Sequence, residues 1–213
     1  MPNYRHSLPV LAAMLPLLLA GCSVLGASRG NLPTIYAPTP NLQADPSWPR
    51  AQWQLGIARP EAPRMLDSLR IAVRPTGDEI QVYAGANWAR PPADQLVDAL
   101  VRVLEDSGSL PSVSRAGSGV ANDYRLLLDL RHYEADYADQ AAPSVVLEVN
   151  AKLLRMRDQR VVQSQTFRQQ VPVGATEIPE VVNAFERGLS TLTVELAGWT
   201  RRTGQADYAN RPR

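Results

Sequence analysis

Residues 124–131, YRLLLDLR, alternate large apolar side chains with polar ones. Successive side chains of a β-strand point to opposite faces, so residues of one parity would share one face. The apolar set comprises Tyr124, Leu126, Leu128 and Leu130. This stretch therefore predicts a β-strand that turns one face to a hydrophobic core.

Two further strands are predicted immediately downstream. Residues 145–153, VVLEVNAKL, alternate in the same way, whereas residues 161–171, VVQSQTFRQQV, carry polar side chains of both parities. Short turns join the three segments, which predicts an antiparallel meander. A strand that is polar on both faces is expected at a sheet edge or in an interface. Gln163 and Gln165 are therefore candidate partner-interface residues.

The sequence upstream adds further β-strands. Short β-prone runs occupy residues 54–58 and 69–74, and residues 79–83 follow a turn at Pro75–Asp78. The last two runs are expected to form a hairpin or a near-hairpin. Residues 34–36 could add an edge strand.

Two amphipathic helices are predicted. One follows Pro91-Pro92, carries apolar residues at helical spacing between Leu96 and Leu104, and stops at Ser107-Gly108. The other spans about residues 178–199, with an apolar stripe. Together with the strands, these helices predict an α+β fold, in which a mostly antiparallel sheet carries the two main helices on one face.

The N-terminal residues predict a lipidated protein. Residues 1–21 contain a basic start and a short apolar run, as in a secretory signal peptide. The run ends in Leu19-Ala20-Gly21-Cys22, which resembles the lipobox of bacterial lipoproteins, so Cys22 is expected to carry a covalent lipid. Ser23 stands where an aspartate would signal inner-membrane retention. We therefore expect anchoring in the outer membrane of a Gram-negative bacterium, facing the periplasm.

These features divide the chain into four expected segments. Residues 1–21 are the signal peptide and residues 22–52 a lipidated tether with a proline-rich part. Residues 53–200 are the α+β domain, and residues 201–213, which lack periodicity, are expected to be a disordered tail.

Composition and motifs argue against several function classes. The chain has 22 basic and 21 acidic residues and a net charge of +1, so nucleic-acid binding is not expected. One cysteine cannot build a multi-thiolate metal site. The only lysine, Lys152, lies in a predicted strand without a Walker loop around it. We expect no metal, no cofactor other than the lipid on Cys22, and no enzyme activity.

From about Leu55 onward the chain resembles the ABC-type transport auxiliary lipoproteins, the PqiC-like partners of MCE-domain lipid transport systems. The resemblance rests on ordered short motifs: Leu55-Gly56-Ile57, Arg70–Arg74, Glu79–Tyr83, and Asn87-Trp88-Ala89 before Pro91-Pro92. It implies an auxiliary role in moving phospholipids or other apolar molecules across the cell envelope, and an MCE-domain protein as partner. Tyr83 and Trp88 are candidates for that contact, with core packing as the alternative.

Two other functions stay open. A structural or assembly lipoprotein, which contacts peptidoglycan or serves outer-membrane biogenesis, would show the same lipobox and fold. A lipid-anchored hydrolase would need His132 at its centre. A homo-oligomer is compatible with all three.

Overall fold

The computed structural model describes residues 32–48 and 50–210. The chain divides into two units, Met1–Leu32 and Pro33–Arg213, and every described helix and strand belongs to the second. Cys22 and the predicted signal peptide lie outside the described residues. No helix among the described residues is both long enough and apolar enough to cross a bilayer.

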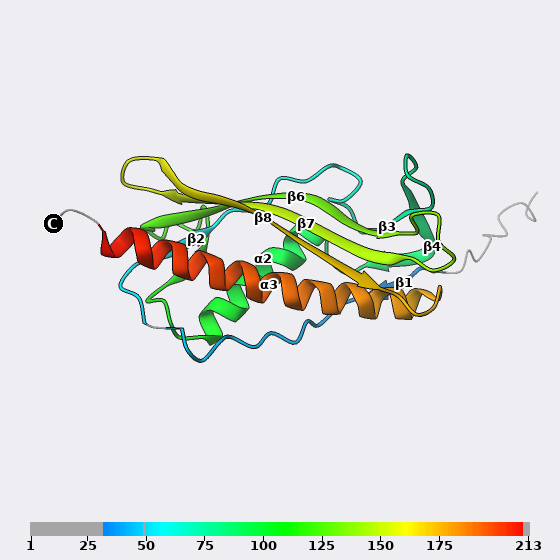
Figure 1. Ribbon diagram of the computed structural model, residues 1–213, viewed down its shortest axis with the longest axis horizontal. Coiled ribbons are helices and arrows are strands. Elements are labelled where there is room, and N and C mark those ends of the chain that lie inside the picture. Colours follow the sequence, from blue (N-terminus) through cyan, green and yellow to red (C-terminus); the bar gives the residue numbers. More distant parts are fainter. Residues whose placement is uncertain (1–31, 49, 211–213) are drawn as a thin grey trace, which may run out of the picture. The chain divides into compact units, whose positions relative to one another are not determined.

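The second unit contains eight strands and two helices among its described residues (Figure 1). In chain order they are β1 (Thr34–Tyr36), β2 (Leu55–Ile57), β3 (Arg70–Arg74), β4 (Gln81–Trp88), α2 (Pro92–Asp106), β5 (Val113–Arg115), β6 (Tyr124–Asp136), β7 (Ser144–Arg155), β8 (Arg160–Pro172) and α3 (Ile178–Ala209).

The strands form one sheet around the long strand β6. β6, β7 and β8 pair antiparallel in sequence order, which confirms the predicted meander. β3 and β4 are also antiparallel, as the predicted hairpin requires. On its other edge β6 pairs in parallel with β2 near Tyr124 and with β3 near Ala135. These parallel ladders are short, so antiparallel pairing dominates the sheet.

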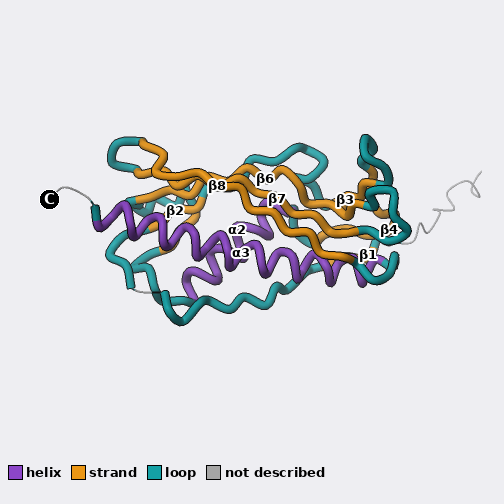
Figure 2. Tube along the Cα trace, viewed as in Figure 1, coloured by secondary structure: helices purple, strands orange, loops and turns teal. Residues whose placement is uncertain are grey.

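Both helices lie on one face of this sheet (Figure 2), and the predicted α+β fold is confirmed. The apolar sides of β6 and β7 are buried beneath them. At the centre of the core, Phe185 of α3 stacks on Tyr133 with ring centroids 5.0 Å apart, and Trp88 meets Phe185 edge-on at 5.1 Å. Burial of these large aromatic rings fixes the position of α3 relative to β4 and β6.

The prediction of disorder from residue 201 is wrong for residues 201–209, which continue α3. Thr203 and Gly204 are buried, and a side chain on Gly204 would meet the ring of Trp53. Further along, Asp207 accepts hydrogen bonds from the Tyr124 hydroxyl at 2.6 Å and from Arg155 at 2.8 Å. The final turns of the helix have no apolar stripe, and these contacts with β6 and β7 hold them in place.

The predicted start of the domain at residue 53 is too late, because the compact unit begins at Pro33. β1 pairs in parallel with β4, and residues 37–48, which we call the strap, then run along the helices (Figure 1). The Thr39 amide donates a hydrogen bond to Glu186 of α3 at 3.1 Å. Leu42, Ala44 and Trp48 pack against the core. The strap is therefore part of the folded unit.

Candidate functional site

The two aromatic residues proposed for a partner contact differ in exposure. Trp88 is 1% exposed and packs on Phe185 and Tyr133, so its proposed place in an interface is wrong. It is a core residue because β4 turns its side chain under the helices. Tyr83 is half-buried on the same strand. Burial and the neighbouring Tyr137 raise the pKa of the Tyr83 phenol, so this residue stays neutral.

The two glutamines proposed for the same contact are exposed and lie on β8. Gln163 accepts a hydrogen bond from the Thr203 hydroxyl of α3 at 3.0 Å, so its side chain is turned to the helix. Gln165 lines a shallow hollow with Trp48 and Arg202, among other residues. The structure thus brings both glutamines to one strand, beside α3 and the end of the strap.

Among the described residues, β8 pairs only with β7, so it forms an edge of the sheet. Its even-numbered side chains contact β7: Ser164 and Thr166 bond Asn150, and Arg168 donates to Glu148 at 2.7 Å. This hydrogen bond lowers the pKa of Glu148. Exposed edges of this length are usually blocked by lysine, proline or several charges. β8 contains two charged residues, Arg160 and Arg168, and its one proline, Pro172, is its last residue.

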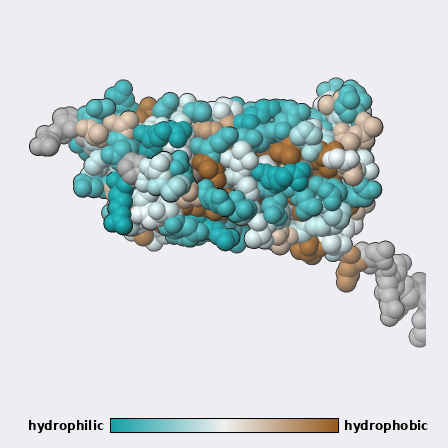
Figure 3. Space-filling model, turned by 60° about the horizontal axis from the view of Figure 1, so that its bottom comes forward, coloured by the Kyte–Doolittle hydropathy of each residue, from teal (hydrophilic) through white to brown (hydrophobic). Residues whose placement is uncertain are grey.

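Apolar residues gather in small patches on the face drawn in Figure 3, within a mostly hydrophilic surface. A partner that binds among these patches would have to recognise backbone, polar groups or a local hollow, because broad apolar contact is not offered there.

His132 lies on β6 and is paired with a carboxylate. Its Nδ1 is 2.7 Å from Oε1 of Glu134, a buried residue that also accepts the Tyr133 amide at 2.7 Å. A histidine and carboxylate could form two parts of a triad. However, no hydroxyl or thiol is hydrogen-bonded to His132 among the described residues, and no group of acids, histidines and cysteines there could hold a metal.

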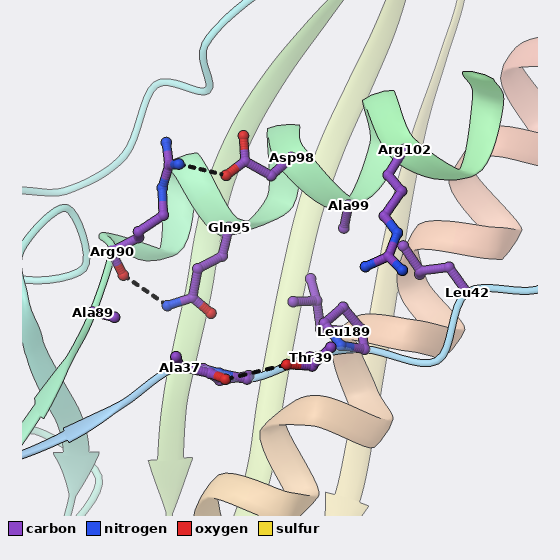
Figure 4. Close-up of a pocket in the computed structure, with 12 residues that line it drawn as sticks. Ala37, Thr39, Leu42, Ala89, Arg90, Gln95, Asp98, Ala99, Arg102 and Leu189 are labelled. Carbon is purple, nitrogen blue, oxygen red and sulfur yellow. Dashed lines mark hydrogen bonds and ion pairs between the residues drawn. The ribbon is translucent and has the colours of Figure 1, made fainter. Parts of the chain in front are cut away.

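A separate cleft of about 250 Å³ lies between the strap, α2 and α3 (Figure 4). Its walls are largely apolar, and Ala99 and Leu189, both buried, form its inner side. The other lining residues are Ala37, Pro38, Thr39, Pro40, Leu42, Ala89, Arg90, Gln95, Asp98 and Arg102. No sequence motif marked this cleft.

Gln95 and Asp98, two polar residues that line the cleft, already have hydrogen-bond or ion-pair partners. Gln95 donates to the carbonyl oxygen of Arg90 at 2.7 Å and accepts the Tyr133 hydroxyl at 3.0 Å. Asp98 is paired with Arg90 at 3.0 Å and also with Arg115. Arg102 lies opposite Leu42, with its guanidinium directed toward the strap (Figure 4). Of the charged residues that line the cleft, two are basic, Arg90 and Arg102, and one is acidic, Asp98.

Comparison with known families gives one match over the folded unit. Residues 34–197 match the ABC-type transport auxiliary lipoprotein component. The chain belongs to this family. The match runs from β1 into α3, so it includes the strap, the edge strand β8 and the cleft between strap and helices.

Solved structures place the auxiliary lipoprotein among proteins of the same fold. Protein XCC0632 from Xanthomonas campestris, a DUF330 protein, is 48% identical, with a TM-score of 0.80 over 83% of this chain and 99% of that one. An uncharacterized protein is 16% identical, with a TM-score of 0.60 over 79% and 98% of the two chains, and shares the fold. No curated protein matches the sequence.

Proposed function

We propose that this chain is a periplasmic lipoprotein, acylated at Cys22 and anchored in the outer membrane, that serves as the auxiliary component of an ABC/MCE transport system. The system would move phospholipids or other apolar molecules across the cell envelope. The observation that carries the proposal is the family match over residues 34–197, which takes in nearly all of the folded unit. The lipobox at residues 19–22 supports the anchor.

The role proposed is docking rather than catalysis. Family membership assigns an auxiliary role, and the His132–Glu134 pair lacks a hydrogen-bonded nucleophile among the described residues. We propose that the MCE-domain partner binds along the edge of β8, next to Gln165. An extended segment can add to such an edge through main-chain hydrogen bonds. Blocking features are confined to the two ends of β8 and to Arg168, which is expected of an edge that is covered in an assembly.

Crosslinking in intact cells tests this proposal. The full chain should capture an MCE-domain protein from the same organism, and Gln165→Lys should reduce that capture because a charge at the edge opposes strand addition. Gln43→Lys makes the same chemical change on the exposed side of the strap and should leave capture unchanged. Capture of peptidoglycan or an outer-membrane assembly factor, and never an MCE protein, would favour the structural or assembly lipoprotein instead.

A further inference from the structure

We propose that the cleft between the strap, α2 and α3 binds a single acyl chain that carries an anionic head group. This inference goes beyond docking and does not depend on the identity of the partner protein. It rests on the shape and the charges of the cleft.

The interior of the cleft favours an apolar chain. Ala99 and Leu189 form its inner side, and Pro38, Pro40 and Leu42 of the strap face them. The half-buried amide of Gln95, which lines the cleft, already uses both its ends, on the Arg90 carbonyl and the Tyr133 hydroxyl. A hydrocarbon segment can therefore displace water from the cleft without leaving an internal polar group unpaired.

The size of the cleft favours one chain. Pockets for drug-sized ligands have volumes of about 300–1,000 Å³, whereas this cleft holds about 250 Å³. A slender chain fits such a volume, while a lipid with two chains would have to keep one of them outside.

The mouth of the cleft favours an anion. Two of the lining residues are basic, Arg90 and Arg102, against one acid, Asp98, which is paired with Arg90 and with Arg115. The side chain of Arg102 is 61% exposed, and its ion-pair partner among the described residues is Asp106 at 3.8 Å, beyond hydrogen-bonding distance. A carboxylate or phosphate head group could replace Asp106 as the partner of Arg102, because a guanidinium presents paired donors that match both groups.

Titration calorimetry with three ligands of equal chain length tests the inference on the purified chain from Ser23 to Arg213, which contains the whole compact unit and lacks the acylated cysteine, in detergent-free buffer. The probes are dodecanoate, dodecyl phosphate and dodecanol. We expect the anions to bind with one-to-one stoichiometry and dodecanol to bind about tenfold more weakly, since it lacks the charge-assisted contact. Tighter binding of dodecanoate would identify a fatty acid as the source of the chain, and tighter binding of dodecyl phosphate a lipid phosphate.

Two substitutions connect binding to the cleft. Arg102→Gln should lower the affinity for both anions about tenfold and leave dodecanol unchanged, while Arg64→Gln, an equal charge change on an exposed residue outside the cleft, should alter nothing. Ala89→Phe should fill the cleft from its exposed side and abolish binding of all three ligands, with an unchanged melting temperature as the control for folding.

Several results would overturn the inference. These are no binding of either anion, anion binding that ignores Arg102→Gln, or an equal loss in Arg64→Gln. Loss of MCE capture in Ala89→Phe with intact dodecanoate binding would make the cleft a protein-docking groove. Because ligand binding is measured without any partner, its failure would leave the proposed docking along β8 standing, and the reverse also holds.

Discussion

Replacing Gly204 with alanine tests whether the end of α3 is packed against the core. A Cβ atom at this position would lie 2.6 Å from Cζ2 and 2.8 Å from Cη2 of Trp53. The indole ring has little freedom to move away. It is fully buried, and it packs edge-on against Tyr124 with centroids 5.1 Å apart. The added methyl group must therefore push the helix away from the ring.

Two opposing effects set the size of the change. Alanine is more favourable than glycine inside a helix by about 1 kcal/mol. Overpacking of a core costs about 1–3 kcal/mol, and contact with a rigid ring places Gly204→Ala at the upper end, about 3 kcal/mol. The free energy of unfolding should fall by about 2 kcal/mol, the difference between these terms. For a domain of this size, the melting temperature should then fall by about 4–8 °C.

Gly198→Ala is the matched control in the same helix. The nearest atom to its added Cβ would be Nη1 of Arg202 at 3.1 Å, the far end of a flexible side chain. This variant should keep the gain in helix propensity and be stabilised by about 0.5–1 kcal/mol. Thermal and urea unfolding, followed by circular dichroism, would measure both changes. If the two variants were equally stable, the packing of residues 201–209 on Trp53 would be refuted.

Two further predictions concern charge and anchoring. Arg168→Gln should destabilise the fold at neutral pH, because the pKa of Glu148 is lowered mainly by its hydrogen bond with Arg168. That stabilisation is fully present above the unfolded pKa of about 4.3 and disappears as pH falls through the lowered folded value, so urea unfolding near pH 3 should show a much smaller difference than near pH 7. Cys22→Ser should yield a precursor without acyl chains that no longer fractionates with the outer membrane. Mass spectrometry that finds an acylated variant would disprove the lipobox assignment.

The elements with strong periodicity could be predicted from the sequence. Strands β6 and β7 alternate over many residues, and α2 carries a clear apolar stripe, so local pattern and final environment agree. β5 could not be predicted in this way. Among the described strands, its three residues pair only with β2, and they have no alternation of their own, so its existence depends on a neighbour that is distant in the sequence.

The last turns of α3 show the same limit in a helix. Residues 201–209 have no apolar stripe, and their order depends on distant parts of the chain, through the packing of Gly204 on Trp53 and through polar contacts with other strands. Asp207 contributes two of these contacts, to Tyr124 and to Arg155, which lie 83 and 52 residues away. A local pattern cannot reveal such distant pairs, so the lack of periodicity in this segment predicts a disordered tail instead.

The candidate sites also differ in whether a local sequence pattern marks them. Gln163 and Gln165 could be placed at an edge because a strand with polar residues of both parities has no face to bury, and β8 is such an edge. The cleft left no comparable sign, since its walls come from separate parts of the chain: the strap, residues 89–90 with α2 as far as Arg102, and Leu189 of α3. The prolines of the strap do predict an extended chain without ladder hydrogen bonds. They do not show that this extended chain lies beside Arg102. That proximity places an arginine at the mouth of the apolar cleft between the strap and the two helices.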